Sequence, residues 1–194
     1  MIAPLAWLAS ADRWLLLKIN RDWSHSSLDA LMPLITDIQK VPWFIYGVAP
    51  AALGLWLWKG RKRALQVLVV AVIAVAGSDV VAYRVVKPWA ARLRPERAGV
   101  AVALRSPSGG TYGFPSNHAA NAGAAAAVLS VAYPAAMPAF AAVAALMAYS
   151  RVYCGVHYPG DVVGGLLLGV AVGWPWALLM LGGGAASPRK KKRA

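Results

Sequence analysis

Five apolar segments constrain the fold of this chain more than any other feature of its sequence. They are approximately 41–58, 64–86, 117–133, 135–151 and 161–181. A helix needs about 20 residues to cross the hydrocarbon core of a bilayer, and about 17–25 are tolerated. The sequence therefore predicts an all-α fold, a polytopic membrane bundle of about five to six transmembrane helices.

Composition supports a place in the membrane. Of the 194 residues, 59% are hydrophobic and 14% are charged, whereas a typical soluble chain is about 45–50% apolar and roughly 25% charged. This balance excludes intrinsic disorder and argues against a water-soluble monomer. A single cysteine, Cys154, excludes an intramolecular disulfide and a thiolate metal cluster.

Two basic runs, 59–63 and 189–193, contribute to the net charge of +13 and flank apolar segments. In a soluble protein this charge would suggest nucleic-acid binding, but basic runs beside membrane spans are typical of cytoplasmic loops. We therefore expect membrane lipids and no nucleic acid as partners. Four crossings connect the two runs, which places 87–116 and 150–161 together on the outer face.

The first 40 residues contain apolar stretches that charged residues, including Asp12 and Arg13, interrupt too early for a signal peptide. We expect an interfacial amphipathic helix and a second short helix at about 27–39, with a sixth, distorted span as the alternative. The predicted organisation is N-terminal interfacial helices over 1–40, a transmembrane domain over 41–186 and a basic cytoplasmic tail over 187–194.

The third and fourth apolar segments meet at Pro134 and Pro138, which predict a tight reversal. Small residues dominate both flanks, as in the run 119–124. Because small residues let helix backbones approach closely in lipid, we expect both segments to lie inside the bundle.

Three polar groups stand out against the apolar background, and each begins or ends a predicted span. They are KPWAARLRP at 87–95, YGFPSNH at 112–118 and SRVYCGVHYPGD at 150–161. The predicted topology brings all three to the same face, and polar groups that converge at one membrane depth indicate a functional site.

The charges of these groups suit an anion. Lys87, Arg94 and Arg151 supply positive charge, and the forked donors of arginine match phosphate oxygens. Ser116 and Asn117 precede an alanine-rich segment, as N-cap residues do, and a helix start presents unpaired N–H groups to an anion. The best-matched ligand is a compact, multiply charged oxyanion such as a phosphoryl group.

Two of the three histidines, His118 and His157, lie in these groups. Histidine can act as a nucleophile or as a general acid and base near neutral pH. Asp161 follows His157 by four residues and can accept its other ring N–H, as in a catalytic triad. Because the groups hold no carboxylate pair and no His/Cys set at ligand spacing, we expect neither metal nor cofactor.

The pattern Lys-x6-Arg-Pro, Pro-Ser-x-His and Ser-Arg-x5-His-x3-Asp over 87–161 resembles the three-part signature of the type 2 phosphatidic acid phosphatase (PAP2) superfamily. This superfamily includes membrane lipid phosphatases and soluble acid phosphatases, and vanadium haloperoxidases share its fold. Every spacing fits. One residue departs from the family pattern, since Asn117 stands where glycine is usual, which leaves the phosphate contact at this position open.

The resemblance implies that His157 attacks phosphorus, that Asp161 orients it, and that His118 protonates the leaving oxygen and then activates water. It also implies the groups that hold the phosphoryl oxygens: Lys87, Arg94, Ser116, Arg151 and the amide of Asn117.

The short length, the five spans and the residues INRD at 19–22 and LDALM at 28–32 are similar to small bacterial undecaprenyl pyrophosphate phosphatases of this superfamily. That similarity implies hydrolysis of a lipid pyrophosphate or phosphate at the outer face of a bacterial inner membrane. The alternatives are a phosphatidylglycerophosphate or lipid A phosphatase and, in a different class, a non-catalytic lipid-headgroup binding or transport protein. Mere binding, however, requires no histidine with an orienting carboxylate. A haloperoxidase is disfavoured because five spans leave little room for a domain that handles an oxidant.

Several charged residues lie outside the motif positions. Asp79, in the middle of a predicted span, is either functional or bonded to a neighbouring helix or to Arg84. Arg92, Arg97 and Arg105 either attract an anionic headgroup or form solvated surface charge.

Overall fold

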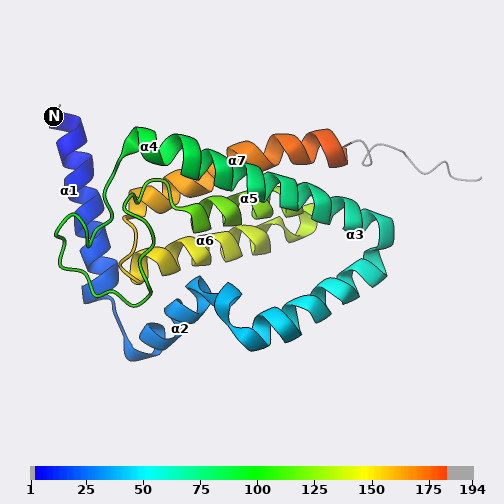
Figure 1. The fold of residues 1–194 in the computed structure, drawn as a ribbon, viewed down its shortest axis with the longest axis horizontal. Helices are drawn as coiled ribbons and strands as arrows, with labels where there is room; N and C mark the ends of the chain where they lie inside the picture. The colour runs from blue at the N-terminus through cyan, green and yellow to red at the C-terminus, as the bar shows by residue number, and fades with distance from the viewer. Residues whose placement is uncertain (1–2, 183–194) are drawn as a thin grey trace, which may run out of the picture.

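The computed structural model describes residues 3–182 as a helical bundle with one long loop, 91–116, at one end (Figure 1). The predicted basic tail at 187–194 lies outside the described residues. The α-helices are α1 Ala3–Leu17, α2 Ser26–Thr36, α3 Ala49–Val80, α4 Lys87–Ala90, α5 Asn117–Ala132, α6 Met137–Tyr153 and α7 Pro159–Leu181. Short helical turns join or extend them: η1 Lys18–Asp22, η2 Ile38–Lys40, η3 Phe44–Val48, η4 Val81–Val86 and η5 Pro134–Ala136.

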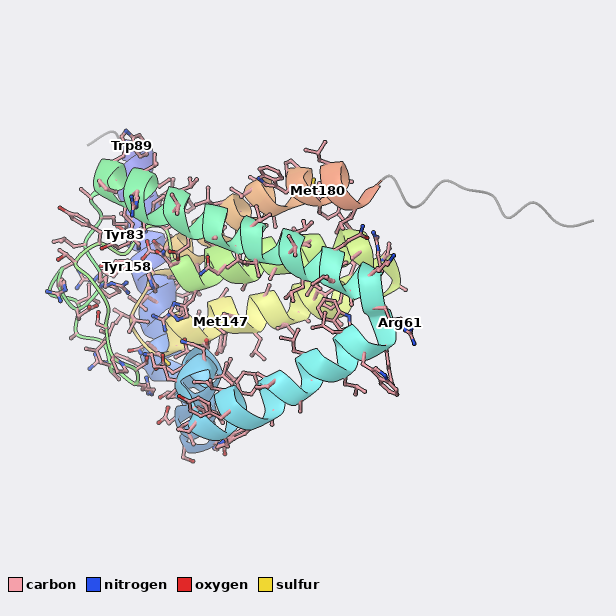
Figure 2. All side chains as sticks on the ribbon, turned by 45° about the vertical axis from the view of Figure 1, so that its right-hand side comes forward. Arg61, Tyr83, Trp89, Met147, Tyr158 and Met180 are labelled. Atoms are coloured by element: carbon pink, nitrogen blue, oxygen red, sulfur yellow. The ribbon has the colours of Figure 1, made fainter. Side chains whose placement is uncertain are left out.

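Among the described residues, three continuous helical stretches are long and apolar enough to cross a membrane: Phe44–Ala90, Pro134–Tyr153 and Pro159–Leu181. The first is 47 residues long and turns back on itself at Arg61, whose φ is 45° (Figure 2). This stretch therefore contains two of the predicted segments. The helical membrane bundle is confirmed, whereas α5, with 16 residues, is shorter than the span length that the sequence suggested.

The reversal at Arg61 depends on its neighbour. A Cβ on Gly60 would lie 2.6 Å from the Cβ of Ala64, so the turn needs a residue without a side chain at this position. The predicted loop between the first two apolar segments is thus reduced to a single break within a continuous helical stretch.

The centre of the bundle is the contact between α5 and α7. Gly165, Gly169 and Gly173 follow one another at helical spacing on α7, and a Cβ on Gly169 would lie 2.0 Å from the backbone oxygen of Ala120. Small residues let these two backbones touch, as expected for close helix packing in lipid. The predicted interior position is confirmed for α5.

Helix α6 differs from the prediction. Its outer face is exposed, with Val143 at 67% and Leu146 at 42% of their full accessibility, so it packs on one side only. The interior partner of α5 is α7 instead, because the glycine row on α7 permits a closer approach than the alanines of α6.

The bundle has two distinct ends. The three polar groups meet at the end with the long loop (Figure 1), where the Arg105 N–H donates to the carbonyl of Cys154 at 3.1 Å. At the opposite end, Arg63, Pro134 and Leu181 line a cavity of about 470 Å³. The basic turn at 59–63 and the polar groups therefore lie at opposite ends of the bundle, as the predicted topology requires.

The N-terminal segment, residues 3–40, crosses the loop end of the bundle (Figure 1). Its two helices match the two predicted ones, while their depth in a membrane stays a prediction. Leu16, Ile19 and Met32 are buried in the core at this end. Asn20 is fully buried, and its side-chain amide donates to the carbonyls of Ala103 and Tyr153 at 2.9 and 2.8 Å. The segment is thus packed firmly onto the loop and α6.

Candidate active site

A cavity of about 690 Å³ opens at the loop end of the bundle. Its lining includes six of the eight predicted site residues, namely Lys87, Arg94, Asn117, His118, Arg151 and His157. The other two, Ser116 and Asp161, are fully buried and are not part of the lining. Residues from three distant stretches of sequence thus come together as the motif spacing suggested.

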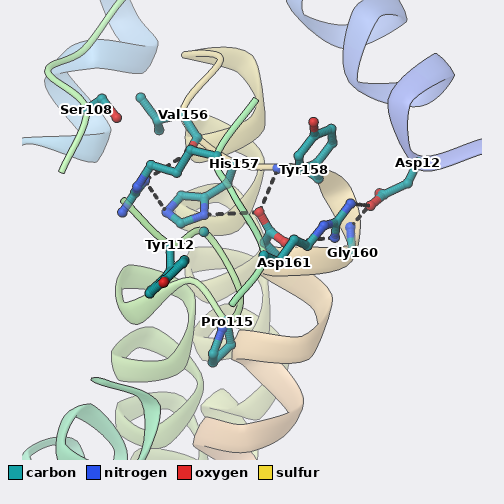
Figure 3. A network of polar contacts seen from close by, with 12 residues as sticks. Asp12, Ser108, Tyr112, Pro115, Val156, His157, Tyr158, Gly160 and Asp161 are labelled. Carbon is teal, nitrogen blue, oxygen red and sulfur yellow. Dashed lines mark hydrogen bonds and ion pairs between the residues drawn. The ribbon is translucent and has the colours of Figure 1, made fainter. Parts of the chain in front are cut away.

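His157 lies between a cation and a carboxylate (Figure 3). Its Nε2 is 3.0 Å from an Nη of Arg94, and its Nδ1 is 3.4 Å from Oδ2 of Asp161. Because a guanidinium can only donate, Nε2 must accept, and the ring proton must be on Nδ1 and point toward Asp161. This places the lone pair of the imidazole on Nε2.

The environment of His157 favours its neutral form. Burial, together with the positive charges of Arg94, Arg151 and Lys87, holds the pKa of His157 well below its ordinary value. Only 1% of its side chain is exposed. A neutral imidazole whose Nε2 carries no proton is the form that can act as a nucleophile.

Backbone carbonyls fix two of the cations. The Nε of Arg94 donates to the carbonyl of Gly110 at 2.7 Å, and one Nη donates to the carbonyl of Val156 at 2.9 Å. The Nζ of Lys87 donates to the carbonyl of Pro115 at 2.7 Å. Burial lowers the pKa of Arg94, but an arginine stays protonated at any physiological pH. Both charges are therefore held in place before any anion binds.

The third cation depends on the N-terminal segment. One Nη of Arg151 donates to the hydroxyl of Thr36, which is fully buried, at 2.8 Å. The Nε of Arg151 is also buried and forms no hydrogen bond within the described residues. Thr36 therefore orients a guanidinium that still has donors available.

His118 also contacts the N-terminal segment. Its Nε2 lies 3.3 Å from the side-chain nitrogen of Gln39. Asp37 and Lys40 line the cavity on the same side and form an ion pair at 2.8 Å. Burial alone would raise the pKa of Asp37, but bonds from Lys40 and Ser106 outweigh it and leave that pKa lowered. The cavity thus has an ionised carboxylate beside its four lining cations.

The start of α5 explains the unusual Asn117. Its side-chain nitrogen donates to Asp79 of α3 at 2.8 Å, and Asn121 donates to the same oxygen at 3.3 Å. Asp79 therefore bonds a neighbouring helix, which is the structural alternative that the sequence left open. Ser116 occupies the N-cap position as predicted, but its hydroxyl makes no capping bond and forms no other hydrogen bond within the described residues.

The family model of the PAP2 superfamily matches residues 63–182, more than half of the chain. This chain belongs to the PAP2 superfamily. The predicted resemblance is confirmed, and the matched region contains all eight predicted site residues.

Known proteins similar to this PAP2 chain are named as phosphatases. An undecaprenyl-diphosphatase of Sulfolobus acidocaldarius is 35% identical over 147 residues, 75% of this chain and 69% of that protein. A lipid A 4′-phosphatase of Bacteroides thetaiotaomicron is 32% identical over 120 residues, 58% of this chain. The match spans about half of that relative's own length, 53%.

A crystal structure of a transmembrane PAP2-type phosphatidylglycerolphosphate phosphatase from Bacillus subtilis superimposes with a TM-score of 0.63. It is 26% identical, and the alignment covers 87% of this chain and 84% of that one. By family and fold, the chain is a helical membrane protein of the PAP2 type.

Sequence reasoning missed the polar residues around this candidate site that do not occupy a fixed motif position. Arg92 is not solvated surface charge, because it forms ion pairs with Asp161 at 2.8 Å and Asp12 at 2.5 Å. Arg105 pairs with Asp29 at 2.7 Å, while Arg97 is exposed. The available signal was a carboxylate, Asp12, in a largely apolar helix whose other charged residue is Arg13, because a carboxylate in such a place calls for a partner.

Within residues 3–182, no three His, Cys, Asp or Glu side chains gather closely enough to hold a metal ion. Cys154, between Arg151 and His157 in the sequence, is buried, and burial raises the pKa of its thiol to about 11. The thiolate form is therefore rare at neutral pH, which makes Cys154 a packing residue rather than a competing nucleophile.

Proposed function

We propose that this protein hydrolyses a lipid pyrophosphate or lipid phosphate monoester through a phosphohistidine formed on His157. Undecaprenyl pyrophosphate, converted to undecaprenyl phosphate, is the substrate that we infer. The observation that carries the proposal is the neutral His157, whose Nε2 lone pair lies at a cavity lined by Lys87, Arg94 and Arg151.

In the first step, Nε2 of His157 attacks phosphorus, an N–P bond forms, and the P–O bond to the leaving group breaks. His118, when protonated, gives its proton to the departing oxygen. The Nδ1 proton of His157 stays toward Asp161, whose negative charge stabilises the positive charge that develops on the ring.

In the second step, His118 takes a proton from water, whose oxygen attacks phosphorus and breaks the N–P bond. Phosphate leaves, and His157 regains its neutral form. Throughout, Lys87, Arg94 and Arg151 hold the phosphoryl oxygens while their charge redistributes. Preorganised donors of this kind are worth about 3–4 kcal/mol each.

Three features support a lipid substrate. The wall of the cavity includes Tyr83, Pro88 and Tyr112 beside the cations. Tyr83, at 64% exposure, lies on the surface of a candidate membrane helix. The similar proteins described above are named as phosphatases of lipid phosphates and a lipid diphosphate.

We further propose that the site faces the outside of a bacterial inner membrane. The basic turn at 59–63 lies at the end of the bundle opposite the cavity, and basic turns favour the cytoplasmic side. Single cysteines at 62 and 108 in a Cys154→Ser background test this, because an impermeant thiol reagent on intact cells should label only position 108. Labelling at 62 alone would reverse the orientation.

The decisive experiment is phosphate release by the purified protein, in EDTA, across a lipid panel. The panel contains undecaprenyl pyrophosphate, phosphatidylglycerophosphate, lipid A and phosphatidic acid at matched detergent concentration. The highest kcat/KM is expected for undecaprenyl pyrophosphate. A preference for lipid A or phosphatidylglycerophosphate would replace undecaprenyl pyrophosphate as the inferred substrate. Loss of activity in EDTA that magnesium restores would overturn the metal-independent mechanism. Binding without turnover would mean that the protein binds lipid headgroups and does not hydrolyse them.

A further inference from the structure

We propose that Arg92 and Asp12 are positioning residues, which fix the carboxylate of Asp161 and thereby the ring of His157. Helix α1 is then a component of the active site. This inference rests on the proposed phosphatase function and goes beyond it. Arg92 occupies an unspecified position of the first motif, Asp12 lies outside all three motifs, and neither residue lines the cavity.

Arg92 bridges two carboxylates with one guanidinium. Its Nη1 donates to Oδ1 of Asp161 at 2.8 Å, and its Nη2 donates to Oδ2 of Asp12 at 2.5 Å. The guanidinium carbon lies 4.2 Å from the ring centroid of Tyr158, so the bridge is also stacked on an aromatic face. These contacts hold the guanidinium from three sides.

The bridge closes into a ring of contacts (Figure 3). Oδ1 of Asp12 accepts the N–H of Gly160 at 2.7 Å, next in sequence to Asp161. A Cβ on Gly160 would lie 2.9 Å from Asp12 and 3.3 Å from Arg92, so the ring leaves no room for a side chain there. Helix α1 is therefore tied both to the backbone at the start of α7 and, through Arg92, to the side chain of Asp161.

This closed set of contacts prevents the carboxylate of Asp161 from rotating. One of its oxygens accepts from Arg92, and the other accepts from the N–H of Tyr158 at 3.0 Å and faces Nδ1 of His157 at 3.4 Å. Asp161 is fully buried, so no solvent replaces a lost partner. Without Arg92, this carboxylate would keep contacts on one oxygen only.

The consequence falls on the chemical step rather than on substrate binding. Lys87, Arg94 and Arg151 hold the phosphoryl group in the proposed reaction, and neither Arg92 nor Asp12 contacts any of them in the described hydrogen bonds. A displaced carboxylate would let the His157 ring turn away from phosphorus, and a misplacement of 1 Å can cost about 100-fold in rate.

The test compares steady-state and single-turnover kinetics of purified Arg92→Gln with those of Arg97→Gln, an exposed arginine of the same loop. Arg92→Gln should lower kcat and the rate of phosphoenzyme formation by about 100-fold, with KM changed less than about threefold. Arg92→Lys keeps one charged donor and should recover part of the rate. Arg97→Gln should match the wild type.

A double-mutant cycle separates positioning from a general loss of stability. Asp12→Asn keeps an oxygen for the N–H of Gly160 and should lower kcat by about tenfold, at an unchanged melting temperature. In the Arg92→Gln background it should have no further effect, since both variants break the same bridge. Asp12→Asn also supplies the test if Arg92→Gln does not fold.

Folded Arg92→Gln or Asp12→Asn with wild-type kcat would overturn the inference. So would losses that multiply in the double variant, or a raised KM at constant kcat. Wild-type protein that forms no phosphoenzyme would instead contradict the proposed function, so the two failures are distinguishable.

Discussion

Two contacts meet at the candidate active site, and they are made in opposite ways. Helices α5 and α7 touch through backbone, with glycines on one helix against carbonyl oxygens on the other. The N-terminal segment contacts the site through polar side chains. Thr36 and Gln39 contact Arg151 and His118 directly, and Asp12 contacts Asp161 through Arg92.

The difference separates two tasks. A contact between backbones fixes where the two helices begin, and those starts carry His118 and Asp161. A contact between side chains cannot set that framework, but it decides how each functional group is turned within it. We call the proposed reacting groups and the α5–α7 contact the framework side of the site, and the contacts of residues 3–40 its N-terminal side. Changes on the framework side should therefore lower activity or stability most, and changes on the N-terminal side should lower the rate less.

The largest effect is expected on the framework side, at the proposed nucleophile. His157→Ala removes the atom that would bond phosphorus, so turnover should fall by at least about 10⁴-fold and acid-labile phosphoenzyme should disappear. His25→Ala is the matched control, because His25 is the exposed N-cap of α2 and its ring contacts none of the eight predicted site residues in the described hydrogen bonds. Phosphoenzyme that persists in His157→Ala would move the nucleophile to another residue.

The next largest effect tests the helix pair itself. Gly169→Ala places a methyl group 2.0 Å from the carbonyl oxygen of Ala120, and such overpacking costs about 1–3 kcal/mol. The melting temperature in detergent should fall by roughly 2–12 °C for a chain of this size.

Gly54 supplies the matched control, because it lies in α3 and a Cβ added there would meet nothing within 4 Å. Gly54→Ala should keep or raise the melting temperature, since alanine is the better helix former by about 1 kcal/mol. Equal behaviour of the two alanine variants would mean that the α5–α7 contact is looser than described.

On the N-terminal side, Thr36→Val removes the hydroxyl that accepts from Arg151 at 2.8 Å while keeping the volume of the side chain. A hydrogen bond to a charged group is worth about 1.5–3 kcal/mol, so kcat/KM should fall by about tenfold, mainly through KM. Thr36→Ser retains the hydroxyl and should stay near the wild type. If both variants lose activity equally, packing at this position matters and the hydrogen bond does not.

The sequence predicted the framework side well, because chemistry demands particular residue types at fixed spacing. Lys87, Arg94, His118 and Arg151 all line one cavity, and His157 meets both a cation and Asp161. The order and spacing of the motifs therefore predicted which residues gather at this cavity. The basic turn also predicted correctly which end of the bundle lies opposite the site.

The N-terminal contacts could not be predicted in the same way. The partners Arg92 and Asp12 are 80 positions apart, and Arg151 and Thr36 are 115 apart, with no periodicity that links them. The wrong expectation for α6 has a related cause, since alanine content shows that a close approach is possible but not which helix makes it. The glycines at 165, 169 and 173 were the more informative signal.

The smallest effect is expected at Gln39, whose amide lies 3.3 Å from Nε2 of His118. An amide has both a donor and an acceptor, so it can bond this ring nitrogen whether or not the nitrogen carries a proton. Gln39 is exposed, and the bond should therefore be weak. Gln39→Ala should lower kcat only about two- to fivefold, well within the contribution of about 10²–10⁴-fold that general acid catalysis makes as a whole.

The direction of this effect depends on the leaving group. A lipid monophosphate must expel a basic alkoxide, whereas a pyrophosphate expels a phosphate monoester, which needs less help from an acid. Gln39→Ala should therefore slow monophosphate hydrolysis more than pyrophosphate hydrolysis. The measurement is the ratio of kcat for the two lipids, with Gln66→Ala on the exposed surface of α3 as the control. An unchanged ratio would show that Gln39 does not act through His118. Thr36 and Asp12 would then be the residues of the N-terminal segment that adjust the site.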